Sequence, residues 1–216
     1  MNIHFRKANT EDIPFIINAI IEAEKSGTEV LSYSRIFNIT ELEVEQLISN
    51  ILDEELEGQE WCLAHFYIAE YANKQAACLS AWIEGLNGLG SGILKAQAMS
   101  YFLGDKWQKS KSQLESVAMV QIPRSHGALQ LENIYTAPDF RGQGIIGQLI
   151  DFVVANYPSD DIVSTYAEIH LMENNEKALH SYTKCGFLED AKNTAADDVV
   201  LTLLPSKTRI ALKRIM

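Results

Sequence analysis

The sequence is poor in the residues that mark several protein classes. Its 216 residues include only three cysteines, Cys62, Cys78 and Cys185, widely spaced and without a Cys-x-x-Cys pair. This arrangement argues against a disulfide framework or a zinc site and predicts reduced, mostly buried thiols and no bound metal. No apolar run approaches the roughly 18 residues of a membrane helix. The N-terminus carries Glu11 and Asp12 instead of an apolar export segment, so we expect a cytoplasmic protein without a membrane partner.

Basic residues are scarce in the first half of the chain. Residues 1–100 hold 6 Lys and Arg against 15 Asp and Glu, a balance of −9, whereas residues 101–216 hold 12 against 14, a balance of −2. A formal charge of −11 makes a nucleic acid an unsuitable partner. Eight carboxylates lie between Glu41 and Glu60 with no Lys or Arg, which predicts an acidic face there. Hydrophobic residues, 47% of the chain, are spread along it and suffice for a folded core.

The first half predicts one short strand, two helices and a hairpin. Residues 3–6 alternate as a strand, and Thr10 is the expected N-cap of a helix over residues 11–25. Thr40 and Glu43 have the spacing of a capping box at the start of a second amphipathic helix. Residues 61–71 and 75–85 are rich in β-forming residues, so we expect them to pair as an antiparallel hairpin.

The second half predicts an alternation of strands and helices. A helical insertion is expected over about residues 84–128, followed by a strand at 128–136, a helix within 141–158, a strand at 165–172 and a helix at 176–184. Residues 197–204 and 208–216 are expected to form a closing hairpin. A β-α-β-α-β run flanked by antiparallel strands predicts a mixed α/β sheet, in a single domain over residues 1–216.

The clearest chemical signal is the glycine loop Arg141-Gly142-Gln143-Gly144-Ile145-Ile146-Gly147, which lies between a predicted strand and a helix. Such a turn presents backbone N–H groups at the positive end of a helix dipole, which suits a pyrophosphate. Its glycines also satisfy G-x-G-x-x-G, and Glu168 follows at about the 20 residues expected of a ribose-binding acid in a dinucleotide site. Only 69 residues follow Gly147, however, which is too little chain for two mononucleotide-binding halves.

Two sequence elements together resemble the GNAT superfamily of acyl-CoA-dependent N-acyltransferases. IYTAPDFRGQGIIGQLI, residues 134–150, resembles the acyl-CoA loop of that family, although Ile146 stands where a second Gly or Ala is usual. NNEKALHSYTKCGF is similar to the downstream element N-x-x-A-x-x-x-Y-x-x-x-G-F at every fixed position. The resemblance covers nearly the whole chain except residues 84–128. It implies the GNAT fold, in which helices lie on both faces of a mixed, mostly antiparallel sheet and a central parallel strand pair splays around the CoA site.

The same resemblance implies acetyl-CoA as co-substrate and a set of residues that bind it. The glycine loop would bind the pyrophosphate, and backbone groups of the preceding strand end would bind the pantetheine arm and the oxyanion. Asn175 resembles a family residue near the pantetheine, and it is also a natural N-cap for the helix at 176–184. The implied CoA-binding residues are Ile134, Tyr135, Thr136, Arg141, Gly142, Gln143, Gly144, Ile145, Ile146, Gly147 and Asn175.

Tyr182 and Glu132 are the candidate catalytic residues. The resemblance makes Tyr182 the general acid that protonates the departing CoA thiolate; the alternative is an aromatic residue that only packs in the core. Some family members carry a glutamate base where this chain has Gln130, and an amide cannot accept the proton. Glu132 lies on the same strand face and is the expected substitute, with the pair Glu168 and His170, or a water chain, as alternatives.

We therefore expect an N-acetyltransferase that moves an acetyl group from acetyl-CoA to a primary amine of a small molecule by direct attack, without an acyl-enzyme on Cys185. The acidic stretch at residues 41–60 favours a cationic acceptor. Two alternatives stay open: a peptide or protein N-acetyltransferase, whose acceptor groove residues 26–40 and 84–128 would build, and a catalytically weak acyl-CoA-binding protein. A homodimer is also left open.

Overall fold

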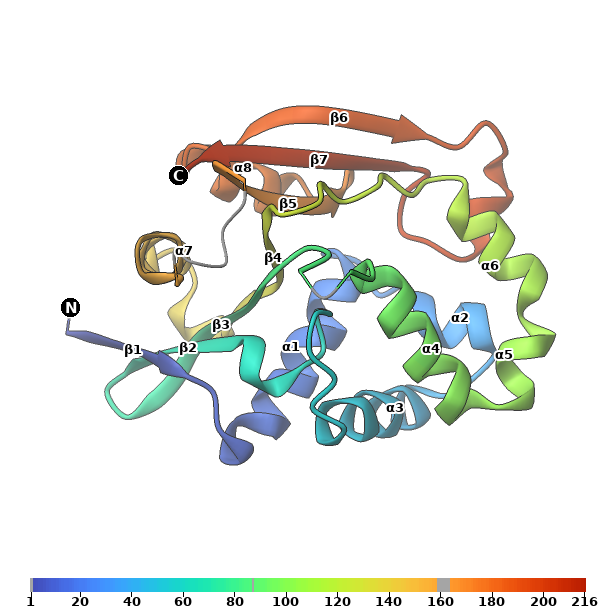
Figure 1. Cartoon of the computed structure of the whole chain (residues 1–216), viewed down its shortest axis with the longest axis horizontal. Coiled ribbons are helices and arrows are strands. Elements are labelled where there is room, and N and C mark those ends of the chain that lie inside the picture. Colours follow the sequence, from blue (N-terminus) through green and yellow to red (C-terminus); the bar gives the residue numbers. More distant parts are fainter. Residues whose placement is uncertain (1, 87, 159–163) are drawn as a thin grey trace.

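A single twisted sheet organises the computed structural model, which describes residues 2–86, 88–158 and 164–216 (Figure 1). Its strand order is β1-β2-β3-β4-β5-β7-β6, and every neighbouring pair is antiparallel except β4 and β5. The strands are β1 (Ile3–Lys7), β2 (Phe66–Tyr71), β3 (Lys74–Ile83), β4 (Leu129–Thr136), β5 (Tyr166–Met172), β6 (Leu188–Thr194) and β7 (Thr208–Ile215). The expected mixed, mostly antiparallel sheet with one parallel pair is confirmed. A doubly wound parallel sheet, which the dinucleotide interpretation requires, is not what these strands form.

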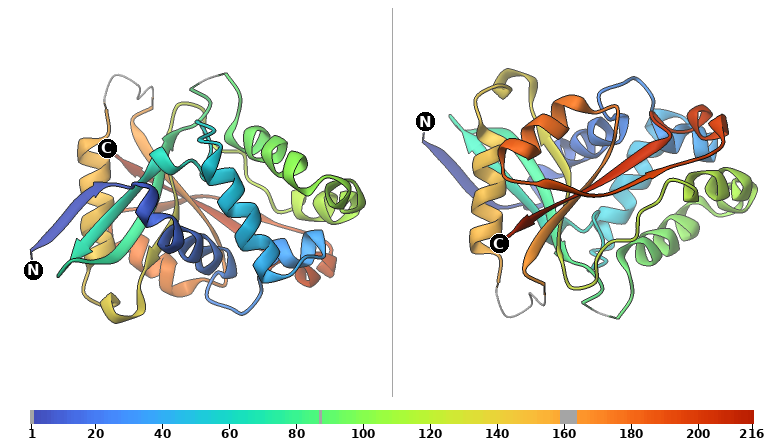
Figure 2. Two further views of the ribbon diagram at one scale, coloured as in Figure 1. Left: turned by 90° about the horizontal axis from the view of Figure 1, so that it is seen from below. Right: turned by 90° about the horizontal axis from the view of Figure 1, so that it is seen from above.

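Helices cover both faces of the sheet (Figure 2). On one face lie α7 (Ile145–Asn156) and α8 (Glu176–Lys184), and on the other lie α1 (Ile13–Lys25), α2 (Ser32–Phe37) and α3 (Glu41–Asp53). Leu129 and Leu131 of β4 pack with α7. Tyr135, which alternation alone would place on the same face, packs with α1 because a bulge between Glu132 and Tyr135 shifts the alternation. Fully buried residues such as Ile48 and Leu149 each contribute about 1.5–3 kcal/mol through their burial.

The stretch expected as a helical insertion contains three helices. They are α4 (Ser91–Leu103), α5 (Asp105–Lys109) and α6 (Lys111–Ala118). The Glu84 carboxylate anchors the start of α4, since it accepts hydrogen bonds from the Ser91 backbone N–H at 2.9 Å and from the Trp82 indole N–H at 3.2 Å. None of the helices in the described part of the chain has the length and apolar character needed to span a membrane.

The two predicted helix starts differ in outcome. The capping box of Thr40 and Glu43 is confirmed, with the Thr40 N–H donating to the Glu43 carboxylate at 2.8 Å and the Glu43 N–H to Thr40 Oγ1 at 3.2 Å. Thr10 as N-cap is wrong, because Asn9 and Asp12 form the reciprocal box around the short turn η1 (Thr10–Asp12). Arg6 holds the Asp12 carboxylate at 2.6 Å and thereby fixes the cap one residue earlier than expected.

The predicted hairpins need two corrections. The pairing of β2 with β3 is confirmed. Residues 61–65, however, are not part of the strand, because they lead into β2 through the 3₁₀ turn η2 (Leu63–His65). Their apolar side chains pack in the core although their backbone makes no strand pairing. Residues 197–204 do not form a strand either, since Asp197 caps the 3₁₀ turn η5 (Asp198–Thr202) and buries Val200. The strand β6 instead pairs with β7; its mostly exposed side chains gave no hydrophobic pattern to predict it.

The parallel pair opens soon after it begins, and this opening positions the site. Leu129 and Gln130 of β4 pair with Ala167 and Glu168 of β5, and beyond Gln130 no β4 residue in the described chain pairs with β5. Asn133, at φ 52°, forms a bulge where the register between β3 and β4 shifts. The two strands therefore splay apart toward Thr136 and Met172, which is the gap that the sequence comparison implied.

Candidate functional site

On the α7 side of the sheet, the glycine loop forms an open cradle. Gly142 and Gly144 have φ angles of 74° and 73°, and a Cβ added to either would meet no atom within 4 Å. Glycine is therefore required here for the backbone conformation and leaves space above the loop for a ligand. Gly144 is the N-cap of α7 and has no side chain to accept hydrogen bonds from the first turn. The first backbone N–H groups of this 12-residue helix are therefore open to a ligand in the space above the loop.

The other loop residues hold the cradle in shape. Arg141 donates through Nε to the Thr136 carbonyl at 3.1 Å, and Gln143 donates through Nε2 to the Asp139 carbonyl at 3.0 Å. Ile145 is buried, and Ile146 packs against the same apolar cluster, so its branched side chain contacts the core. Gly147 differs from Gly142 and Gly144, because a Cβ on Gly147 would lie 3.3 Å from Cys185 Sγ. This glycine therefore permits close packing of α7 against the end of α8.

The end of β4 separates the two faces of the site. Ile134 packs with the α7 cluster, whereas the Tyr135 hydroxyl accepts a hydrogen bond from Asn18 Nδ2 of α1 at 3.1 Å. Thr136 supplies the carbonyl that Arg141 binds. Because β5 separates from β4 beyond Gln130, these three residues border the gap and do not pair with β5.

On α8, Asn175 and Tyr182 lie at opposite ends of the helix. Asn175 is the N-cap, and its Oδ1 accepts a hydrogen bond from the Ala178 N–H at 3.3 Å. Tyr182 is buried on the α7 side; burial raises the pKa of its phenol, and the nearby charge of Glu132 raises it further, so the hydroxyl stays protonated. Tyr182 belongs to α8 and Glu132 to the opposite face of β4, so the two groups interact across the sheet. Burial also raises the pKa of the Cys185 thiol, which disfavours the thiolate that a nucleophile needs.

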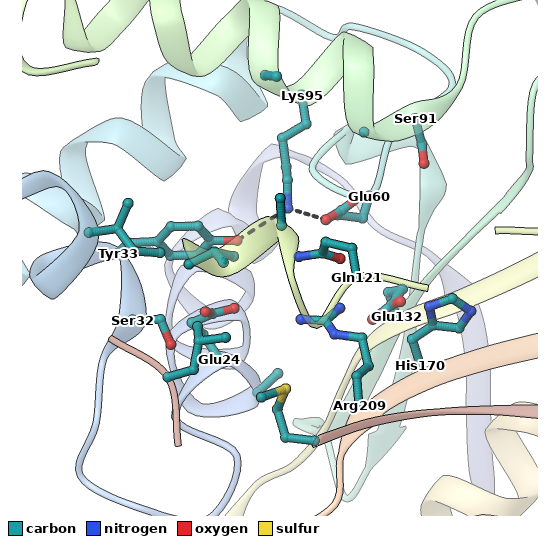
Figure 3. A pocket seen from close by; sticks show the side chains of 18 of the residues that line it. Glu24, Ser32, Tyr33, Glu60, Ser91, Lys95, Gln121, Glu132, His170 and Arg209 are labelled. Atoms are coloured by element: carbon teal, nitrogen blue, oxygen red, sulfur yellow. Dashed lines mark hydrogen bonds and ion pairs between the residues drawn. The ribbon is translucent and has the colours of Figure 1, made fainter. Parts of the chain in front are cut away.

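On the opposite face lies a pocket of about 590 Å³ (Figure 3). Its walls come from α1, α2, α4 and α6, and its floor includes Asn133 and Leu171, which border the gap between β4 and β5. Of the sequence-predicted residues, Glu132 and the alternative His170 line this pocket. Gln130 is fully buried and outside the lining, so the position used by some family members for a base does not face this pocket.

Salt bridges order the pocket wall around Glu132. Its carboxylate accepts a hydrogen bond from Arg124 Nη2 at 3.0 Å, and the same nitrogen lies 3.7 Å from Glu60 Oε2. Glu60 also binds Lys95 of α4. Burial alone would raise the pKa of Glu60, but the charges of Lys95 and Arg124 outweigh it and lower that pKa to about 2. Glu60 is therefore ionised at neutral pH, and the salt bridges hold both carboxyl groups in place.

A second acid–base pair lies beside the pocket. His170 Nε2 is 2.5 Å from Glu168 Oε1, and both side chains are buried. Glu168 also accepts a hydrogen bond from the Ser125 N–H at 3.3 Å. Burial would raise the pKa of Glu168, yet the bonds to His170 and Ser125 lower it overall, so Glu168 is a carboxylate that orients the imidazole.

The predicted acidic face does not border the pocket. Glu41 and Glu43 of α3 are exposed and pair with Lys25 and Lys106, whereas Glu60 alone of the eight carboxylates in that stretch lines the cavity. Apart from Glu60, the carboxylates of this stretch therefore do not face an acceptor in the pocket.

Sequence reasoning missed several pocket residues: Glu24, Tyr33, Lys95, Arg124 and Arg209. Lys95 gave a usable signal, because it is the one charged residue in the otherwise apolar or neutral run of α4. Arg209 and Glu24 lie 185 positions apart, and no local pattern brings them together. Within residues 2–86, 88–158 and 164–216, no group of three or more His, Cys, Asp or Glu side chains is arranged to hold a metal ion.

Comparisons with known proteins identify the family. The model for the acetyltransferase (GNAT) family matches residues 35–187. An N-acetyltransferase from Staphylococcus aureus Mu50 has a TM-score of 0.66 at 19% identity, covering 97% of this chain and 99% of that chain. RimL, a ribosomal L7/L12 alpha-N-protein acetyltransferase solved with coenzyme A, has a TM-score of 0.57 at 14% identity, covering 100% and 95%.

A third structure is the microcin C7 self immunity acetyltransferase MccE, solved with acetyl-CoA and AMP. Its TM-score is 0.55 at 11% identity, covering 99% of this chain and 92% of that chain. At these identities the solved structures establish a shared fold, which agrees with the sheet and the splayed strand pair described above. No curated protein sequence matches the chain.

Proposed function

The chain belongs to the GNAT acetyltransferase family, and from this premise we propose that it transfers an acetyl group from acetyl-CoA to a primary amine of a small molecule. The observation that carries the proposal is the gap between β4 and β5, which has the glycine cradle on the α7 side and the charged pocket on the other. A donor held on one face and an acceptor held on the other would meet in this gap. Direct attack in a ternary complex then needs no acyl-enzyme.

The residues around the cradle fit the pyrophosphate and pantetheine of acetyl-CoA. The space over Gly142 and Gly144 is the volume that a Cβ would fill, and the N–H groups at the start of α7 would bind phosphate oxygens. Structural neighbours solved with coenzyme A or acetyl-CoA support this donor. Arg141 and Gln143 shape the loop, and the unpaired edge of residues 134–136 would hold the pantetheine amides. When bound, acetyl-CoA supplies an activated thioester.

The chain's own residues would then move two protons. As the amine nitrogen bonds to the thioester carbonyl carbon and the carbon–sulfur bond breaks, Glu132 accepts the proton that the amine loses and Tyr182 gives a proton to the sulfur. Burial keeps the Tyr182 phenol protonated, and its raised pKa makes it a weaker acid than a free tyrosine, so the proton moves only as negative charge develops on the sulfur. Backbone N–H groups at the end of β4 would stabilise the oxyanion.

Glu132 is assigned as the base because it lines the pocket and belongs to β4, the strand that borders the gap. The pair Glu168 and His170 is the alternative, since its imidazole also lines the pocket and is oriented by a carboxylate. Substituting each separately decides between them.

The size and walls of the pocket support a small-molecule acceptor. A volume of about 590 Å³ lies within the range of small-molecule sites. Parts of residues 26–40 and 84–128, the segments that a peptide groove would use, form walls of this pocket, with Ser32 and Tyr33 from one and Lys95 and Met99 from the other. The three free cysteines support the expectation of a reducing, cytoplasmic location.

The test is acetyl transfer with a panel of amines. Purified protein, acetyl-CoA and each amine are incubated, free CoA thiol is titrated, and the acetylated product is measured by mass spectrometry. We expect equal amounts of CoA and N-acetylated product with small amines. Turnover confined to peptides would support the protein acetyltransferase, and tight CoA binding without turnover would support the weak acyl-CoA-binding protein. Affinity for NAD without affinity for CoA would contradict the proposed donor.

A further inference from the structure

Two charged side chains in the pocket, Arg209 of β7 and Glu24 of α1, have no ion-pair partner among the residues that the structure describes. The other charged groups of the lining are engaged with one another or with neighbouring N–H groups. The engaged sets are Lys95 with Glu60, Arg124 with Glu132 and Glu60, His170 with Glu168, and Glu84 with Trp82 and Ser91. The pocket therefore contains one guanidinium and one carboxyl group that have no ion-pair partner among the described residues and are available to a ligand.

Arg209 is directed into the cavity. It lies at the start of β7, opposite Met172 of β5, and its side chain points toward the centre of the pocket (Figure 3). Its Nε is buried and, among the described residues, has no hydrogen-bond acceptor. A buried N–H donor without an acceptor is costly, so this guanidinium is placed where an incoming acceptor atom would stabilise it.

Glu24 approaches the same space from the opposite wall. Figure 3 shows its carboxylate directed into the pocket from α1, beside Ser32. Burial raises the pKa of Glu24, although the positive charges of Lys95 and Arg209 oppose the rise, and Glu24 makes no ion pair with either in the described structure. A ligand with an anion for Arg209 and an amino group for the Glu24 carboxyl would complement this arrangement better than a simple amine or a simple acid.

We propose that the acceptor is an amino acid or a closely related small molecule, whose carboxylate binds Arg209 and whose amino group hydrogen-bonds with the Glu24 carboxyl. The planar guanidinium matches a carboxylate through two parallel hydrogen bonds. Arg209 is the register partner of Met172 of β5, the strand that borders the gap, so a carboxylate on Arg209 would place the ligand on the β5 side of the pocket. This inference rests on the proposed acetyl transfer and adds the class of acceptor.

Matched pairs of acceptors test the role of the carboxylate. Each amino acid is compared with the amine formed by its decarboxylation: lysine with cadaverine, alanine with ethylamine, and phenylalanine with phenethylamine. We expect kcat/KM to be about 10- to 100-fold higher for the carboxylate-bearing member, the effect of a charge-assisted hydrogen-bonded pair. Arg209→Gln should remove this preference by lowering kcat/KM for the carboxylate-bearing member of each pair, and Arg209→Lys should retain part of it.

Arg214→Gln is the matched control. Arg214 lies on the same strand but pairs with Asp151 on the α7 side, outside the pocket lining, so this variant should keep the carboxylate preference. Equal turnover of both members of each pair by the wild type would overturn the inference while the proposed acetyl transfer stands. A preference that survives in Arg209→Gln would overturn the role of Arg209.

A binding measurement keeps the inference testable without turnover. The unfolding temperature is recorded with each amino acid and each decarboxylated amine, in the presence of CoA. We expect amino acids to raise it in the wild type and in Arg214→Gln, but not in Arg209→Gln. No response to any amino acid in the wild type would overturn the acceptor class. Absence of CoA binding and of all turnover would instead contradict the proposed function.

Discussion

Replacing Gly144 with alanine tests whether the loop binds the phosphates of CoA. Gly144 has a φ of 73°, and a Cβ at this position would point into open space without touching the protein. The left-handed backbone conformation costs an alanine about 1 kcal/mol of folding free energy. For a chain of this length, that corresponds to a decrease in unfolding temperature of roughly 2–4 °C.

The expected loss of CoA affinity is larger than the loss of stability. The added Cβ occupies the space from which a phosphate would reach the N–H groups at the start of α7. Losing one charge-assisted hydrogen bond of about 1.5–3 kcal/mol weakens binding roughly 10- to 100-fold. Calorimetric titration of CoA into wild type and Gly144→Ala measures this change directly.

Gly88→Ala is the matched control for this prediction. Gly88 also has a positive φ, 83°, with no atom within 4 Å of an added Cβ, but it lies in the loop before α4, far along the chain from the cradle. It should lose a similar amount of stability and keep wild-type CoA affinity. The reasoning is refuted if Gly144→Ala binds CoA as tightly as the wild type, or if Gly88→Ala loses as much affinity.

Three further predictions follow from the same geometry. Tyr182→Phe should lower kcat by about 100-fold or more, the usual contribution of a general acid, with the Kd for CoA unchanged in calorimetry; unchanged kcat would exclude the acid role. Glu132→Gln should lower kcat/KM about 100-fold and His170→Gln only slightly in thiol-release assays, and the reverse would assign the base to the imidazole. Asp12→Asn should cost about 2–3 kcal/mol of unfolding free energy in denaturant, because it removes the buried partner of Arg6. Burial opposes ionisation of Asp12, but the hydrogen bonds from Arg6 lower its pKa overall, so wild-type stability should fall more steeply than that of the variant below about pH 4.

The sequence predicted the strand–helix core of the fold well because periodicity and caps act locally. The capping box at Thr40, the helix after the glycine loop and the strand–helix–strand order around it required only nearby residues. The predictions at 61–65 and 197–204 failed because tertiary packing made apolar residues fold into 3₁₀ turns instead of strands.

For the candidate site too, contiguous motifs could be recognised in the sequence and long-range contacts could not. The loop from Arg141 to Gly147 and the helix with Tyr182 are contiguous motifs, and resemblance was enough to identify them. The pocket is built from residues far apart in the chain, such as Glu24, Lys95 and Arg209, which only the folded sheet and helices bring together. The proposed donor side therefore depends on contiguous sequence motifs, whereas the residues of the pocket came together only in the structure.

The most direct test of the central claim is the structure of the protein with acetyl-CoA bound. We predict the pyrophosphate over Gly142 and Gly144 at the start of α7, with the thioester between β4 and β5 beyond Gln130, close to Tyr182 on one face and open to the pocket of Glu132 on the other. Acetyl-CoA bound elsewhere, or with its thioester separated from that pocket by the sheet, would contradict the account.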